Sequence, residues 1–179
     1  MNVAGVEKVE ESVGMNHLIA LVFDDQFKGE EARAGLHRMA GEGLLEIKDT
    51  VIVVRKPDGK TQVTQEDKVT KEGQKAGHIA GLLAAAVTGT LPFILAGTLA
   101  GRLVGRLMDH GITHKFIKDL RQEVRPGTSA LILLAASDPE RRREVEERMQ
   151  GFGAKILRSD LPPEVEQEVE DEIERQKAA

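Results

Sequence analysis

The sequence predicts an α+β fold in which two similar strand–helix–strand units share one antiparallel sheet. Short apolar runs at residues 17–23 and 129–136 each precede a helical pattern. Those patterns end in "RMAGEGLLEI" (38–47) and "RMQGFGAKIL" (148–157), which share Arg-Met-x-Gly-x-Gly followed by an apolar strand. Two such units typically form a ferredoxin-like split βαβ sheet of order 4-1-3-2 with helices on one face. A Gly-rich apolar helical hairpin is predicted as an insertion between the two units.

The composition narrows the classes of function. The chain has 179 residues, enough for one domain with a sizeable core and an insertion. A net charge of −5 with no Trp or Tyr argues against a nucleic-acid partner. Without Cys there is no thiol nucleophile and no Cys-type zinc site. No nucleophile elbow, Walker loop or dinucleotide fingerprint is present, so we expect no enzyme activity and no cofactor.

The first half is expected over residues 15–65, after a flexible extension at residues 1–14. Its strand "HLIALVF" leads to Asp25, a suitable helix cap, and then to a helix with apolar residues on one face. These apolar residues are Ala32, Leu36 and Met39. The second strand extends into a hairpin that turns at Pro57-Asp58-Gly59 and returns as "KTQVTQ".

The second half is expected over residues 126–160. Its helix carries Val145 and Met149 on one face, and Ser137 with Pro139 suits its start. Gly41 and Gly151 suit the left-handed residue that closes each helix. The two wholly apolar strands are predicted to be central, and the second strand of each half, which carries charge, is predicted to lie at an edge.

Residues 66–125 form the insertion, and their glycines are spaced for helix packing. Glycine recurs every fourth residue in two strips, which permits close helix approach, and Pro92 lies between the strips. The glycines assigned to oligomerisation or helix packing are Gly73, Gly77, Gly81, Gly89, Gly97, Gly101 and Gly105.

The uncharged stretch at residues 76–101 is long enough for one membrane crossing. A single crossing would place the two halves on opposite sides and prevent a shared sheet, so it is disfavoured. Two alternatives stay open: a hairpin that dips into or lies on a bilayer, and a hairpin buried by copies of itself in a soluble homo-oligomer. Arg102 and Arg106 follow this stretch and suit anionic headgroups, an acidic partner, or a solvated helix end.

The layout resembles a bacterial family of unknown function that is often labelled "predicted membrane protein". The matching features are "HLIALVFDD", the Gly-spaced apolar hairpin, "GITHKFIKDLRQEVRPGTSALILL" and the closing βαβ unit. The resemblance covers about residues 15–165 and implies a glycine-zipper hairpin between two ferredoxin-like halves. It implies no catalytic residues. The membrane label rests on the same apolar stretch, so it adds no independent argument.

Two clusters were weighed as ligand sites. Asp24 and Asp25 follow a strand and are better explained by helix capping than by cation binding. His110 and His114 have a metal-ligand spacing, but Gly111 lies between them and further ligands are missing, so we predict no metal site. Residues 161–179 are expected to form an acidic C-terminal helix that either docks or is solvated.

The sequence therefore favours a non-enzymatic, homo-oligomeric structural or accessory protein that assembles through glycine-zipper helices. The alternative is a soluble oligomer that encloses a lipid-like or other apolar small ligand. The expected partners are a second copy of the chain and membrane lipid, with no nucleic acid. The expected location is the cytoplasm, with a peripheral position at the inner membrane.

Overall fold

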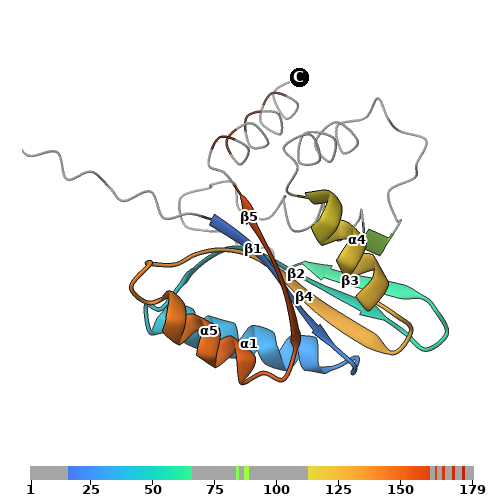
Figure 1. Ribbon diagram of the computed structural model, residues 1–179. Helices are drawn as coiled ribbons and strands as arrows, with labels where there is room; N and C mark the ends of the chain where they lie inside the picture. Colours follow the sequence, from blue (N-terminus) through green and yellow to red (C-terminus); the bar gives the residue numbers. More distant parts are fainter. Residues whose placement is uncertain are drawn as a thin grey trace, which may run out of the picture.

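A single antiparallel sheet organises the protein (Figure 1). The computed structural model describes residues 16–65, 84, 87–88 and 113–161, together with positions 164, 167, 171 and 175. The strands are β1 (Asn16–Phe23), β2 (Glu46–Arg55), β3 (Thr61–Gln65), β4 (Thr128–Ala136) and β5 (Lys155–Leu161). The helices are α1 (Lys28–Gly41), α4 (Thr113–Glu123) and α5 (Arg142–Gln150). The predicted mixed architecture with an antiparallel sheet is thereby confirmed.

The strand order is β3-β2-β4-β1-β5. β1 pairs with β4, so that Leu21 lies opposite Leu131, and these two apolar strands are adjacent and interior as predicted. The prediction that the second strand of the first half lies at an edge is wrong. β3 pairs with β2 from Val51 to Arg55 and covers that edge, so the sheet has five strands where a four-stranded order was expected. β5 is an edge strand, as expected.

The two faces of the sheet carry separate apolar layers, because successive side chains of a strand point to opposite faces. One face packs against α1 and α5 through the predicted helix residues, all of which are buried. They are Ala32, Leu36, Met39, Val145 and Met149. The other face packs against α4 and against Ala84 and Val87. Figure 1 shows α1 and α5 together on one side of the sheet and α4 on the opposite side.

The left-handed glycines that follow α1 and α5 are the second glycines of the repeated Arg-Met-x-Gly-x-Gly motif. Gly43 has φ 73° and Gly153 has φ 69°. The prediction for Gly41 and Gly151 is wrong, because Gly41 is still helical and Gly151 has φ −61°. The first glycine of the motif keeps a right-handed backbone, within α1 at Gly41 and as the C-cap of α5 at Gly151, and the left-handed residue comes two positions later, where glycine adopts this backbone without steric cost.

Helix starts and the hairpin turn follow local hydrogen bonding. Asp25 Oδ1 accepts from the backbone N–H groups of Phe27 (2.7 Å) and Lys28 (3.2 Å), so it bonds the start of α1, although the N-cap position itself is held by Phe27. Before α5, Asp138 rather than Ser137 accepts from a backbone N–H, because the helix begins only at Arg142. The predicted turn at residues 57–59 is confirmed, with Gly59 at φ 82°.

Several predicted features lie outside the described residues. They are the N-terminal extension, Gly73, Gly77, Gly81, Gly89, Gly97, Gly101, Gly105, Arg102, Arg106 and His110. Of the acidic C-terminal segment, positions 164, 167, 171 and 175 are described and helical.

Candidate functional site

Helix α4 separates apolar and basic residues onto opposite faces. Its apolar side packs on the sheet and contains Phe116, Ile117 and Leu120, continued by Val124 just after the helix. These residues recur at i, i+1, i+4 and i+8, which places them on one side of a helix. The opposite side carries the α4 basic face, defined by His114, Lys115, Lys118, Arg121 and Gln122.

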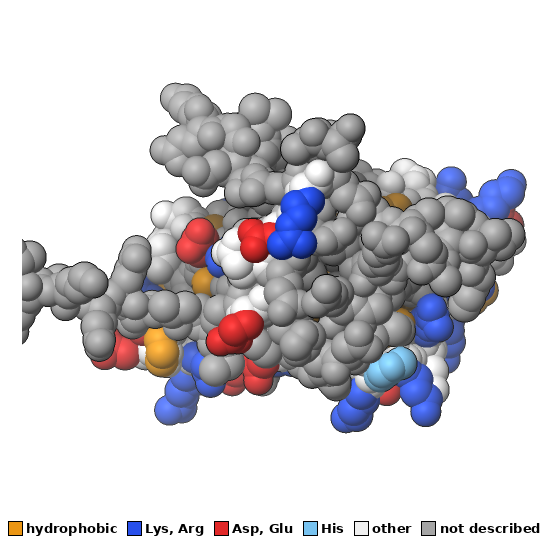
Figure 2. All heavy atoms as spheres, turned by 90° about the horizontal axis from the view of Figure 1, so that it is seen from above, with side chains coloured by type: hydrophobic (Ala, Val, Ile, Leu, Met, Phe, Trp, Pro, Cys, Tyr) orange, Lys and Arg blue, Asp and Glu red, His pale blue; other side chains and the backbone are white. Residues whose placement is uncertain are grey.

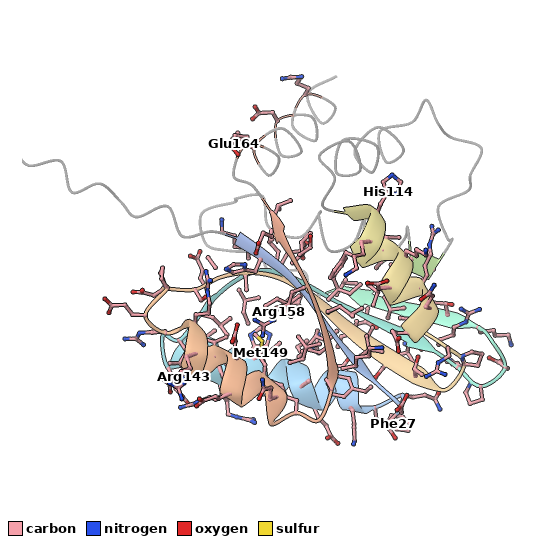
Figure 3. All side chains as sticks on the ribbon, in the orientation of Figure 1. Phe27, His114, Arg143, Met149, Arg158 and Glu164 are labelled. Atoms are coloured by element: carbon pink, nitrogen blue, oxygen red, sulfur yellow. The ribbon has the colours of Figure 1, made fainter. Side chains whose placement is uncertain are left out.

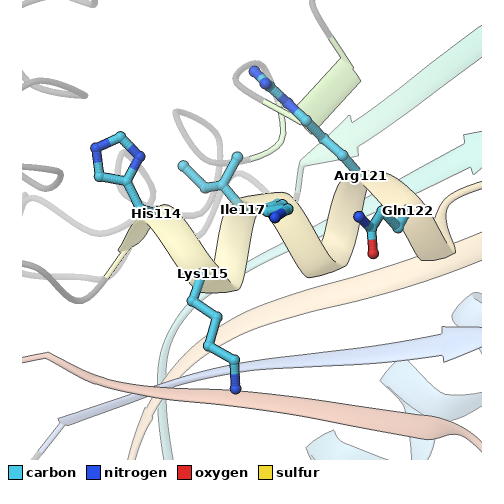
Figure 4. A pocket seen from close by; sticks show the side chains of 6 residues that line it. His114, Lys115, Ile117, Arg121 and Gln122 are labelled. Atoms are coloured by element: carbon cyan, nitrogen blue, oxygen red, sulfur yellow. The ribbon is translucent and has the colours of Figure 1, made fainter.

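A hollow of about 470 Å³ lies along the α4 basic face. It is lined by His114, Lys115, Ile117, Lys118, Arg121 and Gln122. Figure 4 shows His114, Ile117 and Arg121 projecting from one side of α4, and Lys115 and Gln122 from the other. Seen from the α4 side, a histidine lies among Lys and Arg side chains near one margin of the molecule (Figure 2). The lining therefore combines cations with one aliphatic side chain.

The C-terminal end of α4 is fixed to the sheet on two sides. Arg55 Nη1 of β2 donates to the Val124 carbonyl at 3.2 Å, where a cation also favours the negative end of the helix dipole. Lys155 Nζ of β5 donates to Glu123 Oε1 at 2.5 Å. Gly127 N–H donates to the Arg55 carbonyl at 2.7 Å, which ties the following turn to β2. These bonds hold the C-terminal end of α4, and with it the α4 basic face, in a defined position on the sheet.

The acidic residues of α4 border its basic face and lie outside the hollow. Helical spacing puts Asp119 and Glu123 on the flank between the two faces, and Glu123 is paired with Lys155. None of the ion pairs found among residues 16–65 and 113–161 involves Lys115 or Lys118, and both side chains are exposed. The face therefore has a positive potential suited to an anionic group.

The two clusters weighed as ligand sites in the sequence have three members in the described part of the chain, namely Asp24, Asp25 and His114. Asp24 is solvated, with its side chain 94% exposed, and lies 4.0 Å from the Arg125 guanidinium. Asp25 bonds the start of α1, and His114 lies on the α4 basic face. The described residues contain no group of three or more His, Asp or Glu arranged to hold a metal ion.

One polar pair lies away from α4. His17 Nδ1 lies 2.8 Å from Asp160 Oδ1, across the β1–β5 pair, and His17 Nε2 is buried without a hydrogen-bond partner. Strand register explains the contact, because these two residues are direct neighbours on the two strands. The Asp160 side chain is 69% exposed, and neither residue lines the hollow beside α4.

Sequence reasoning named only His114 of the α4 basic face, as one of two histidines for which no metal site was predicted. The signal was available: cations at 114, 118 and 121 repeat at i, i+4 and i+7, opposite the apolar set that starts at Phe116. The segment "THKFIKDLRQE" was treated as the exit from the apolar insertion, so its two faces were not separated.

Searches of curated proteins and of solved structures found no significant match. The sequence profile described as "Protein of unknown function (DUF1269)" matches residues 70–174. The match includes α4, β4, α5 and β5, and it leaves β1, β2 and β3 outside. Because it covers more than half of the 179 residues, the chain belongs to the DUF1269 family.

Proposed function

We propose that this protein is a non-enzymatic, homo-oligomeric accessory protein that assembles through the glycine-zipper helices of its insertion. In this proposal a ferredoxin-like split βαβ domain carries the glycine-rich hairpin between its two halves. The chain acts in the cytoplasm and associates peripherally with the inner membrane. Its partners are copies of itself and membrane lipid.

One observation carries the proposal: the described parts of the insertion lie on the same face of the sheet. Ala84 and Val87, near its beginning, are buried in the apolar layer that also contains Phe116 and Leu120 of α4, near its end. Ala84 and Val87 of the uncharged stretch are therefore held on this face, and α4 packs on the same face. An apolar segment held on one face favours burial by a neighbouring surface.

The glycine spacing supports assembly through that segment. Glycines four residues apart allow two helices to approach closely and to gain van der Waals contact. No helix in the described part of the chain is both long enough and apolar enough to cross a bilayer. Association at the membrane surface is compatible with one sheet shared by both halves. A single membrane crossing within residues 76–101 would place the paired strands β1 and β4 on opposite sides of the bilayer.

The test compares Gly77→Leu and Gly97→Leu with the control Gly41→Leu. Gly41 is exposed at the end of α1, and an added Cβ would meet nothing within 4 Å, so the control adds equal apolar bulk elsewhere. Sedimentation velocity should show a lower mass for both insertion variants and the parent mass for the control. Native mass spectrometry of detergent-free protein gives the number of copies, and a retained lipid would favour the alternative of a lipid-enclosing oligomer. If both insertion variants keep the parent mass and stability, the glycine-zipper proposal is wrong.

A further inference from the structure

We propose that the α4 basic face binds the acidic C-terminal segment of a second copy of this chain. This segment, residues 162–179, is called the acidic tail below. The contact is electrostatic and uses residues separate from the glycine strips, so it is a second interface in addition to the proposed glycine-zipper assembly.

The receiving surface has the shape and charge for an acidic helix. The hollow of about 470 Å³ follows α4 for two turns, from His114 to Gln122. Lys115 and Lys118 are exposed, and no acidic residue lines the hollow among the described residues. An acidic segment placed there would meet several cations at once, which matters because a single exposed ion pair contributes little to binding.

The acidic tail has the complementary charge. It contains seven Asp or Glu residues against two Lys or Arg residues. Its described positions are helical, and Glu164 and Gln167 are exposed. Just before it, Leu161 is fully buried in the apolar layer on the α4 side of the sheet, which fixes the point from which the tail departs.

At the described positions, neither Lys115 nor Lys118 of the α4 basic face makes an ion pair, and Glu164 of the tail makes none either. Figure 3 shows the labelled side chains of Glu164 and His114 apart from each other. Within the tail, Gln167 donates to Asp171 at 2.8 Å, so this contact is local to the tail. The exposed Lys115 and Lys118 of the face and the exposed Glu164 of the tail are therefore available to pair between two copies. Such reciprocal pairing generates a closed dimer.

The test uses the absence of native cysteine. Chains carrying Lys118→Cys are mixed with size-tagged chains carrying Gln167→Cys, and a short bismaleimide is added. Lys118 lies on the α4 basic face and Gln167 is exposed on the tail, so a contact between copies should give a mixed cross-linked product. Lys56→Cys replaces Lys118→Cys in the control, because Lys56 is an exposed lysine on the β2–β3 hairpin, outside the α4 basic face.

We expect the mixed product with Lys118→Cys and its loss with Lys56→Cys. The product should also be lost when Glu164→Lys and Asp171→Lys are added to the tail, and should return when the partner chain carries Lys115→Glu. It should decline when salt is raised from about 0.1 M to about 1 M, which shortens the Debye length from about 10 Å to about 3 Å. The variants Gly77→Leu and Gly97→Leu test the glycine-zipper interface, so the proposed assembly and the proposed tail contact can fail separately.

Three outcomes would overturn the inference. A chain that carries both cysteines and forms only an internal cross-link would show that the tail docks on its own α4. Equal products at positions 118 and 56 would show nonspecific collision. Protection of the thiol at position 118 by vesicles of phosphatidylcholine and phosphatidylserine, without a mixed product, would identify a membrane surface as the occupant.

Discussion

The ring of Phe152 lies against the backbone of Gly35. A Cβ added at Gly35 would lie 2.5 Å from Phe152 Cε1, closer than carbon atoms approach in proteins. Gly35 is buried in the middle of α1, and Phe152 follows α5 in the repeated Arg-Met-x-Gly-x-Gly motif. The residue Phe152, which follows α5, therefore packs against α1 at a position where α1 has no side chain.

Gly35→Ala should destabilise the protein, although alanine is the better helix former. The new methyl group forces Phe152 to move, and overpacking of this kind costs about 1–3 kcal/mol in the free energy of unfolding. Gly41→Ala is the matched control, because its Cβ would meet nothing within 4 Å. Urea unfolding of both variants gives the comparison. A Gly35→Ala protein as stable as Gly41→Ala would contradict this packing.

Ser129→Ala should remove a link between β4 and the start of α1. Ser129 is fully buried, and its Oγ donates to the Asp25 carbonyl at 2.5 Å and accepts from Gly29 N–H at 3.2 Å. Loss of the hydroxyl leaves two buried backbone groups without this partner, which costs about 1–3 kcal/mol. Ser137→Ala, at a partly exposed serine that follows β4, serves as control and should be near neutral. Thermal unfolding followed by circular dichroism measures both.

Ala84→Leu tests whether the insertion packs on the sheet. Ala84 is fully buried in the layer with Phe116 and Leu120, so three extra carbon atoms have no space and should cost about 1–3 kcal/mol. Ala34→Leu is the control, because Ala34 is exposed on α1. Chemical unfolding should give a lower free energy of unfolding for Ala84→Leu than for Ala34→Leu. Equal stabilities would mean that Ala84 is not held against the sheet.

Arg148→Gln should lower stability at low salt and much less at high salt. Arg148 joins α5 to the end of α1 by donating to Glu42 at 2.5 Å and to Glu144 at 3.1 Å. The hydrogen bond to Glu42 raises the pKa of Arg148, so the folded protein holds this proton more tightly than the unfolded chain does. That contribution is present throughout neutral pH and is lost only as pH rises through the raised pKa.

The loss of stability in Arg148→Gln should therefore be the same at neutral and at mildly alkaline pH. Melting temperatures of parent and variant at each pH and salt concentration provide the measurement. Arg143→Gln is a suitable control, because Arg143 pairs only within α5, with Glu147. A salt-independent loss would mean that packing of the Arg148 side chain matters more than its charge.

Asp58 and Arg142 should lie on the same side of any membrane. β2, which enters the turn at Asp58, and β4, which leads to α5, are paired in one sheet, and both must stay in one aqueous phase. Single cysteines introduced at 58 or 142 report without interference, because the chain has no Cys. Labelling with an impermeant maleimide before and after cell lysis should give matching patterns. Opposite patterns would contradict the shared sheet.

The sequence by itself determined the secondary structure of both halves. Apolar runs, helical spacing and the repeated Arg-Met-x-Gly-x-Gly motif located β1, β4, α1 and α5, because periodicity reports which side chains a helix or strand must bury. It also identified the role of Asp25 at the start of α1 and the turn at residues 57–59, which depend on neighbours in the chain.

Only the tertiary structure decided how these elements meet. The hairpin of β2 and β3 follows from the sequence, but the structure shows that β3 occupies the sheet edge at which β2 was expected. The pairing of β2 with the distant strand β4 is not encoded in local periodicity. The choice of Gly43 and Gly153 over Gly41 and Gly151 depended on where packing ends each helix. The structure also decided which side of α4 faces outward. Phe116, Ile117 and Leu120 are buried against the sheet, and Lys115 and Lys118 are therefore left exposed.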